Sequence, residues 1–290
     1  MSPLAFEDEK INCPYCQTVS GFDFPFYSRS YYHCPSCDLI FNAREKNSAS
    51  SVSYYRDHYF DDYAEDQTSG QRTDLYRHIL HLLEGYQKPG SLLDAGCGCG
   101  FFLKEAKESG WKVAGVDTSR KSIAFATTLV GDGTFFDSLD DVPANSHFDV
   151  ITMINVLDHM TDAFRQLQKA KDLLSPGGVL YLRFPSGSFH SFFVRLALML
   201  PSKQCMNRFL VFHEYAFTPW AITRILDEMG FVDVKVFNSY ITGGNFSSAK
   251  LLRSLMGTSC RLLEKLSGGR WLWGPSLEVI VFKEAEVCKY

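Results

Sequence analysis

A glycine-rich loop at residues 94–100 constrains this chain more than any other stretch. An apolar run ends at Asp94, glycines follow at alternate positions, and a helical pattern begins at Phe101. The three glycines are Gly96, Gly98 and Gly100. Glycine lets the backbone bend sharply and lets a ligand lie against bare main chain, while the start of a helix presents unpaired N–H groups. We therefore predict a strand, a tight turn and a helix that together hold a nucleotide-like molecule.

From residue 91 onward the pattern alternates between strands and helices, which is typical of a doubly wound parallel sheet. Ligands of such sheets bind beyond the carboxyl ends of the strands, so residues that end strands matter most. Asp94 ends the first predicted strand and Asp117 ends the second. The strands after the first are predicted at 112–116, 133–139, 147–154, 179–184, 231–237 and 276–283, the last one running in reverse beside its neighbour.

The spacing D-x-G-x-G-x-G resembles motif I of the class I S-adenosylmethionine-dependent methyltransferases. A dinucleotide fingerprint would need glycine at position 101, where this chain has Phe101. The block 147–160 is similar to the fourth-strand block of the same family, with Asp158 where that family usually has Glu. Matches run in the family's order from Leu92 to Phe184. The resemblance implies an α/β, Rossmann-like sheet of seven mostly parallel strands, with S-adenosylmethionine as cofactor.

The resemblance also implies roles for the residues at the strand ends. Asp94 would orient the methionine part of the cofactor, and Asp117 would accept both ribose hydroxyls, a use that nicotinamide enzymes share. Side chains after the third strand would flank the adenine, although Asp137 also fits an ordinary loop acid. Asn155 would lie near the sulfonium. The predicted cofactor site comprises Asp94, Gly96, Gly98, Gly100, Phe101, Asp117, Thr118, Phe136, Asp137, Ser138 and Asn155.

Two Cys-x-x-Cys pairs stand near the N-terminus, Cys13 with Cys16 and Cys34 with Cys37. Their spacing is that of a four-thiolate zinc ribbon. A catalytic zinc normally keeps one position open for water or substrate, so four thiolates favour a structural zinc over a catalytic or redox role. We predict a zinc ribbon over residues 1–41, too small to fold without its metal.

Residues 42–90 are predicted to form a linker and an N-terminal helical lid. The stretch 42–53 is rich in Ser, Asn and charge, and 54–63 is dense in aromatic residues and carboxylates. Two interpretations stay open. The tyrosines pack on the main domain from one face of an amphipathic helix, or the hydroxyls of Tyr55 and Tyr59 face substrate beneath a lid.

The methyltransferase domain is predicted to span 91–290, with an inserted helical cap near 186–218 and an extra helix near 246–267. The segment 212–219 resembles a His-Glu-His segment in the zinc-ribbon branch that contains sugar C-methyltransferases. His213 and Glu214 match that segment, and Tyr215 replaces its second histidine.

Methyl transfer from a sulfonium needs a base when the acceptor is a hydroxyl, a protonated amine or a carbon acid, and imidazole suits that role at neutral pH. His159 and His213 are the candidate bases, and a histidine satisfied within the core is the alternative for His213. Glu214 would orient or polarise the reacting groups, and Tyr55 or Tyr59 would contribute a hydroxyl.

The chain's net charge of −4 and isoelectric point near 6.1 give no general attraction to polyanions, which weighs against nucleic acid as the main partner. Its first residues lack the pattern of a signal peptide, so we expect a cytoplasmic protein. The predicted function is methyl transfer to a small molecule, such as a sugar or another precursor of a secondary metabolite or of the cell surface. A zinc-ribbon RNA base methyltransferase and a non-catalytic S-adenosylmethionine-binding protein remain alternatives, and monomer and homodimer stay open.

Overall fold

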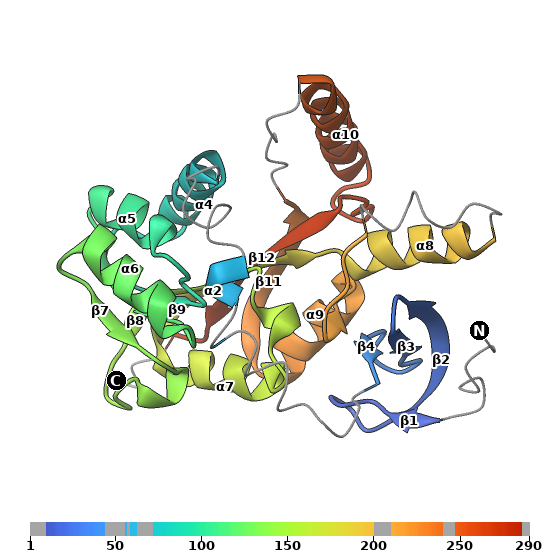
Figure 1. Ribbon diagram of the computed structural model, residues 1–290, viewed down its shortest axis with the longest axis horizontal. Helices are drawn as coiled ribbons and strands as arrows, with labels where there is room; N and C mark the ends of the chain where they lie inside the picture. Colours follow the sequence, from blue (N-terminus) through green and yellow to red (C-terminus); the bar gives the residue numbers. More distant parts are fainter. Residues whose placement is uncertain are drawn as a thin grey trace.

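The computed structural model describes residues 10–43, 56, 59–62, 72–199, 210–239 and 247–285. Two sheets dominate these parts of the chain, one of seven strands and one of five. Figure 1 shows helices on both faces of the larger sheet and the smaller sheet beside it. Within the described residues, no helix combines the length and the apolar character that crossing a membrane requires.

The large sheet has the strand order β11-β12-β9-β8-β5-β6-β7. Neighbours from β9 to β7 are parallel, and β12 runs antiparallel to both β9 and β11. This confirms the predicted seven-stranded, mostly parallel sheet with a reversed last strand. The strands are β5 (Ser91–Ala95), β6 (Lys112–Val116), β7 (Thr134–Phe136), β8 (Phe148–Ile154), β9 (Leu174–Pro185), β11 (Phe231–Asn238) and β12 (Ser276–Lys283).

One strand begins earlier than the sequence predicts. The sequence predicts this strand to begin at residue 179, but β9 already starts at Leu174, which pairs with Phe148. The register shifts between Phe148 and Val150, and Gly177 has φ +74°. The glycines therefore form an irregular stretch within the strand instead of preceding it.

Helices α4 (Thr73–Glu84), α5 (Phe101–Glu108) and α6 (Arg120–Val130) cover one face of this sheet, and α7 (Ala163–Leu173) and α9 (Pro219–Glu228) cover the other (Figure 1). Leu75, Ile79 and Leu83 recur at helical spacing along α4 and are buried in one core with Phe102. On the opposite face, helix residues such as Leu167 and Ile225 are buried with strand residues such as Leu93, Ile151 and Leu182. Because both faces are covered, the buried residues of the central strands are mainly apolar, with Asp94 and Thr152 as exceptions.

The smaller sheet joins the N-terminal part of the chain to the main domain. Its order is β1-β2-β3-β4-β10, with β1 (Ile11–Asn12), β2 (Val19–Phe26), β3 (Arg29–His33), β4 (Ile40–Asn42) and β10 (Tyr215–Ala216). The first four strands belong to residues 10–43, which we call the four-cysteine unit. β10 comes from the main domain and pairs antiparallel with β4. The four-cysteine unit is therefore bonded into the main domain through a shared sheet, which its sequence did not reveal.

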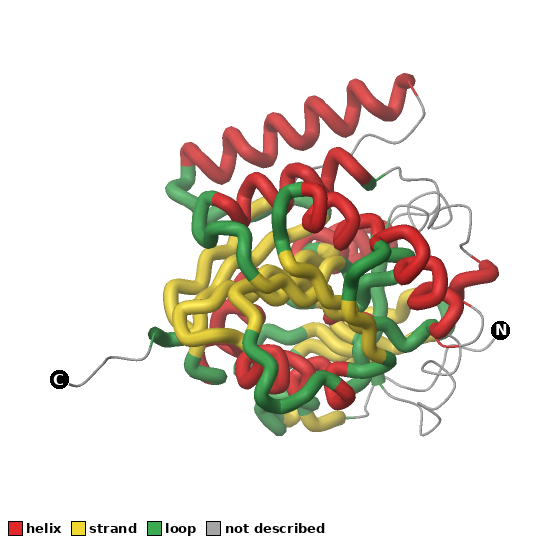
Figure 2. Tube along the Cα trace, turned by 90° about the vertical axis from the view of Figure 1, so that its left-hand side faces the viewer, coloured by secondary structure: helices red, strands yellow, loops and turns green. Residues whose placement is uncertain are grey.

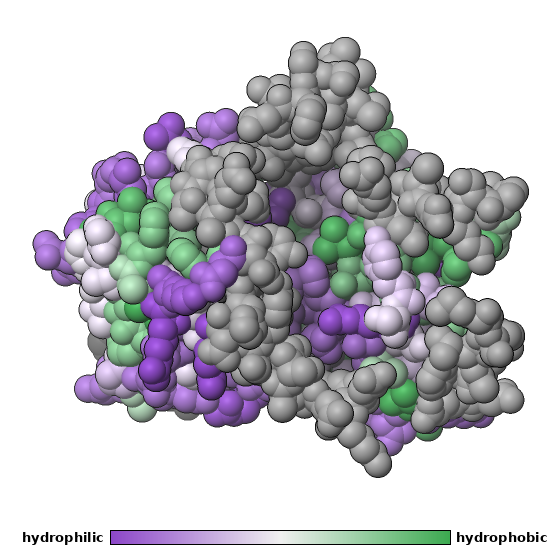
Figure 3. Space-filling model, in the orientation of Figure 1, coloured by the Kyte–Doolittle hydropathy of each residue, from purple (hydrophilic) through white to green (hydrophobic). Residues whose placement is uncertain are grey.

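Two further helices lie outside the large sheet. Helix α10 (Ser247–Leu266) contacts β11 and is the long helix along the edge of the molecule in Figure 2. Helix α8 (Gly187–Leu198) occupies the start of the predicted cap and contacts β2 of the four-cysteine unit, where Arg195 pairs with Asp23. Hydrophobic residues gather beside α8 in Figure 3, and Phe192 on this helix is 46% exposed. Residues 200–209 of the predicted cap lie outside the described residues.

Candidate functional site

The glycine loop adopts backbone conformations that other residues rarely take. Gly96, Gly98 and Gly100 have φ values of +86°, +50° and +78°. The N–H groups of Gly96 and Cys97 both donate to Val116 O, at 2.7 and 2.9 Å. A Cβ placed on Gly96 would lie 2.6 Å from Val156 Cγ2. The loop therefore curls over the end of β6 and lies against a residue just beyond the end of β8.

Asp117 fastens this loop to the start of α6. Its Oδ2 accepts a hydrogen bond from Gly98 N at 2.8 Å, and its Oδ1 accepts one from Ser119 N at 2.8 Å. Each carboxylate oxygen has two lone pairs, so each retains one for a further donor. Burial raises the pKa of Asp117 above its ordinary value. The geometry leaves this acid able to accept two hydroxyl donors at once.

Asp94 lies on the neighbouring strand at the same edge, because Ala95 pairs with Val116 in parallel register. Asp94 is 3% exposed, and its Oδ1 accepts a hydrogen bond from Thr152 Oγ1 at 2.6 Å. Burial raises its pKa to about 7, and the negative charge of Asp117 contributes to that rise. A buried carboxyl of this kind is stabilised in its ionised form by a nearby cation.

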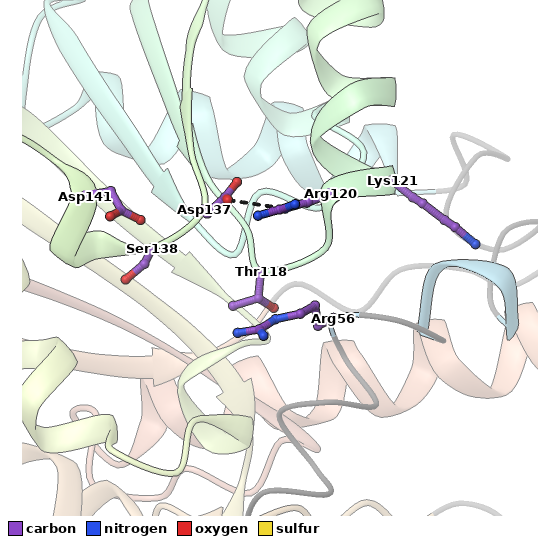
Figure 4. A pocket seen from close by; sticks show the side chains of 7 residues that line it. All are labelled: Arg56, Thr118, Arg120, Lys121, Asp137, Ser138 and Asp141. Atoms are coloured by element: carbon purple, nitrogen blue, oxygen red, sulfur yellow. Dashed lines mark ion pairs between the residues drawn. The ribbon is translucent and has the colours of Figure 1, made fainter.

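A cavity of about 650 Å³ opens beside Thr118, the residue after Asp117 (Figure 4). Thr118, Asp137 and Ser138, all predicted to bind cofactor, line it together with Arg56, Arg120, Lys121 and Asp141. In Figure 4 the side chain of Lys121 points away from the others, and it pairs with Asp61 of α2 (Tyr59–Asp62). The basic side chains of this cavity are not among the cofactor-binding residues predicted from the sequence.

The remaining predicted cofactor residues lie around the same strand ends. Phe136 ends β7, and its carbonyl accepts a hydrogen bond from Asp117 N at 3.2 Å. The ring of Phe101 lies 5.9 Å from that of Phe125 in α6. Asn155 follows β8 with φ +55°, and its Oδ1 accepts a hydrogen bond from Arg183 Nη1 at 2.5 Å.

Asp158, His159 and His213 form a compact cluster just beyond Asn155. Asp158 is 2% exposed, and its Oδ2 lies 3.9 Å from His159 Nε2 and 3.8 Å from His213 Nε2. The two imidazole rings are stacked, with centroids 3.5 Å apart and planes tilted by 31°. Both Nε2 atoms therefore lie within 4 Å of the same carboxylate oxygen. The three groups are close enough to exchange a proton, and their ligand atoms, all within 4.8 Å of one another, could also hold a metal ion.

Burial shifts the pKa of every member of the cluster. It lowers the pKa of His159 to about 3, with the charges of His213 and Arg29 adding to the effect, and it lowers the pKa of His213 to about 4. It raises the pKa of Asp158 to about 7. Both imidazoles are therefore uncharged at neutral pH, while Asp158 titrates there.

The four-cysteine unit contacts one side of this cluster. Tyr31 donates its hydroxyl hydrogen bond to His213 O at 2.8 Å, and Arg29 Nη1 lies 3.3 Å from Glu214 Oε1. Glu214 N donates to Asp158 O at 3.0 Å, while Glu214 O accepts from Asn42 N at 2.9 Å. The backbone of Glu214 thus bridges the two parts of the chain.

Neither of the two predicted tyrosine hydroxyls belongs to a side chain that the structure describes. Tyr55 lies outside the described residues, and of Tyr59 the structure describes the backbone position in α2 alone. Sequence reasoning missed Arg29 and treated Asp158 only as a departure from a family pattern. Neither residue carries a local signal, since Arg29 follows an ordinary turn and the burial of Asp158 depends on tertiary packing.

The four predicted metal ligands meet in the four-cysteine unit. Sγ–Sγ distances are 3.6 Å between Cys13 and Cys37, 3.5 Å between Cys16 and Cys34, and 3.7 Å between Cys16 and Cys37. Zn–S bonds of about 2.3 Å in a tetrahedron place sulfur atoms about 3.8 Å apart. The four thiols therefore fit a tetrahedral zinc ion.

Comparison with known sequences identifies the family. The family model described as "Methyltransferase domain" matches residues 68–236, more than half of the 290-residue chain. The ubiquinone biosynthesis O-methyltransferase of Bradyrhizobium sp. (strain ORS 278) is 27% identical over 144 residues, covering 47% of this chain and 55% of that protein. The enzyme of the same name from Nitrosospira multiformis is 30% identical over 97 residues, covering 31% and 41%. The chain thus spans about half the length of the curated relatives it matches.

Solved structures share the fold at lower identity. The plantazolicin methyltransferase BpumL, solved with S-adenosylhomocysteine, is 17% identical with a TM-score of 0.55, covering 81% of this chain and 93% of that one. A methyltransferase from Archaeoglobus fulgidus is 20% identical with a TM-score of 0.51, covering 78% and 100%. The family match, the strand order and the glycine loop together lead to one assignment: the chain belongs to the class I S-adenosylmethionine-dependent methyltransferases.

Proposed function

We propose that this protein transfers the methyl group of S-adenosylmethionine to a hydroxyl group of a small molecule. The observation that carries the proposal is the junction of the glycine loop with Asp94 and Asp117 at one edge of the sheet. Asp117 would accept the ribose hydroxyls, and Asp94 would face the cationic methionine part. Adenine would lie in the cavity next to Phe136, Asp137 and Ser138, and Asn155 would lie near the sulfonium.

The reaction requires alignment more than activation of the leaving group. A lone pair of the acceptor oxygen attacks the methyl carbon, the carbon–sulfur bond breaks, and sulfur keeps the electron pair as S-adenosylhomocysteine forms. Holding the three atoms in line supplies much of the rate enhancement. The hydroxyl proton has to leave, and the sulfur cannot take it.

We propose that the stacked pair of His159 and His213 accepts this proton. Both imidazoles are uncharged at neutral pH, so each has a nitrogen lone pair, but a pKa of about 3 or 4 makes each a weak base unless a nearby anion stabilises the imidazolium. Asp158 lies within 4 Å of both Nε2 atoms, and its ionised form would stabilise the imidazolium. Glu214 would hold Arg29 and the backbone of the cluster in place.

Two observations favour oxygen as the acceptor atom. The curated relatives are named O-methyltransferases. Tyr215, which replaces the second histidine of the sugar C-methyltransferase branch, is buried and donates its hydroxyl hydrogen bond to Thr161 O at 3.2 Å. The third group of that branch's segment is therefore engaged elsewhere, which supports hydroxyl methylation over sugar C-methylation.

We also propose that Cys13, Cys16, Cys34 and Cys37 hold a structural zinc ion. Three of the four side chains are buried, and their sulfur atoms already have near-tetrahedral spacing. When bound, the ion would fix the two turns of the four-cysteine unit and leave no open position for substrate.

Transfer of tritium from labelled S-adenosylmethionine tests the function. We expect label to appear in a small-molecule fraction of a cell extract with the wild-type protein and not with Asp117→Ala. Label recovered in RNA would contradict the proposal and support an RNA methyltransferase. Tight S-adenosylhomocysteine binding without any transfer would favour the non-catalytic alternative.

A further inference from the structure

A second cavity, of about 250 Å³, lies between the four-cysteine unit and the segment that carries His213. Residues 26–29, at the turn between β2 and β3, line one side of it, and residues 210–213 line the other. These two stretches are far apart in the sequence and come from different parts of the fold. The cavity therefore reaches His213 from the side of the four-cysteine unit.

The walls of this cavity are mainly apolar and aromatic. Phe26, Leu210 and Phe212 are buried there, and the rings of Phe26 and Phe212 lie 5.0 Å apart. Phe212 also packs against Phe24 and Tyr31, so this wall is fixed by an aromatic cluster. Such walls accept a flat, apolar ligand.

Among the described residues that line the cavity, Arg29 carries the one full positive charge. Its Nη1 lies 3.3 Å from Glu214 Oε1, and the side chain is 41% exposed. A guanidinium has five N–H donors in a planar fork, so this contact leaves donors for another anion. Its charge also acts on both imidazoles, since it lowers the pKa of His159 and of His213. Arg29 is thus close to the proposed base without being part of it.

We propose that this cavity binds the methyl acceptor, and that Arg29 of the four-cysteine unit recognises an anionic oxygen group on a flat, mainly apolar acceptor. The proposal rests on the methyl-transfer function and names its substrate class: an aromatic or similarly flat hydroxy compound with a carboxylate or a phosphate ester. The anion at Arg29 would direct the ring along the aromatic wall and present the hydroxyl to His213. The four-cysteine unit then acts as a specificity element for the acceptor.

The test uses small probes with the full-length protein saturated with S-adenosylhomocysteine. Phenyl phosphate and benzoate carry the anion, and benzyl alcohol is their neutral counterpart. We expect both anionic probes, or one of them, to bind at least about tenfold more tightly than benzyl alcohol, since hydrogen bonds between charged groups are stronger than those between neutral groups. A preference for phenyl phosphate identifies a phosphate ester as the group recognised, and a preference for benzoate identifies a carboxylate.

Arg29→Gln should remove that preference while leaving the affinity for benzyl alcohol unchanged, and Arg29→Lys should retain part of it. Arg77→Gln is the matched control, because Arg77 is an exposed arginine of α4 that pairs with Glu105. Equal affinity of wild type and Arg29→Gln for the anionic probes overturns the proposal, and so does weak binding of both anionic probes to wild type. The dissociation constant of S-adenosylhomocysteine, measured in parallel, reports separately on the methyltransferase function.

Discussion

Tyr215 of the main domain pairs in antiparallel register with Phe41 of the four-cysteine unit. His213 precedes this pairing by two residues, and Cys37 lies four residues before Phe41. A second hydrogen bond connects the same two parts of the chain, since Thr218 Oγ1 donates to Asp38 Oδ2 at 2.5 Å. The thiol cluster is therefore connected through short, hydrogen-bonded segments to His213, on the side of the site where we propose that the acceptor binds.

Loss of the proposed zinc site should therefore damage methyl transfer far more than cofactor binding. We expect Cys34→Ser to lower turnover by about 100-fold, because displacement of a catalytic group by about 1 Å can cost that much. Affinity for S-adenosylhomocysteine, measured by calorimetry, should stay within about threefold, since the loop and both acids lie on other elements. Cys260→Ser, a buried cysteine outside the four-cysteine unit, is the control. Equal loss of both properties would show that the four-cysteine unit supports the whole fold and not the acceptor side.

Asp117→Ala should weaken S-adenosylhomocysteine binding by at least about 100-fold. The variant removes the proposed ribose acceptor and also the bonds to Gly98 N and Ser119 N, and each hydrogen bond to a charged group contributes about 1.5–3 kcal/mol. Calorimetric titration measures the change. Asp140→Ala, an exposed acid paired with Arg165, should bind as wild type does. An unchanged affinity in Asp117→Ala would place the ribose elsewhere.

Affinity for S-adenosylmethionine should rise as the pH increases from about 6 to about 8. The pKa of Asp94 is raised to about 7, so this carboxyl is mostly protonated near pH 6 in the ligand-free protein. A bound sulfonium favours the ionised carboxylate, so binding releases a proton, and affinity grows until the pH exceeds that pKa. Calorimetry in buffers of different ionisation enthalpy measures the release. In Asp94→Asn both the proton release and this pH dependence should disappear, and their persistence would assign them to another group.

Asp158→Asn should stabilise the protein near pH 8 and have little effect near pH 4. The pKa of Asp158 is raised from 3.8 to about 7 in the folded state, so the wild type loses stability as the pH rises from the unfolded-state value through the folded-state one. The full effect is on the order of 4 kcal/mol. Urea unfolding at both pH values measures the difference. A difference between variant and wild type that does not vary with pH would contradict the assignment.

His159→Ala and His213→Ala should each reduce turnover while leaving cofactor affinity almost unchanged. Loss of general base catalysis costs about 10²–10⁴ in rate. Turnover of the labelled cofactor with an active acceptor fraction measures the effect, and calorimetry with S-adenosylhomocysteine provides the comparison. His147→Ala, at the opposite end of β8, is the control. Parent-like rates in both variants would exclude the stacked pair as the base.

The sequence alone determined the strands and the glycine loop that form the candidate cofactor site. The strands predicted at 112–116 and 276–283 have the bounds of β6 and β12, and the reversed direction of the last strand agrees as well. The positions of Asp94 and Asp117 at adjacent strand ends follow from the same pattern. These features can be predicted from the sequence because periodicity, glycine conformation and strand order are properties of contiguous stretches.

Only the tertiary structure determined which residues come together on the side where we propose that the acceptor binds. The stacking of His159 on His213, the burial of Asp158 beside them and the approach of Arg29 join segments that no local pattern relates. The pairing of β10 with β4 involves a two-residue strand, which is too short to show periodicity. A residue's burial and charge environment depend on what packs against it from elsewhere in the chain, and that becomes fixed only when the fold closes.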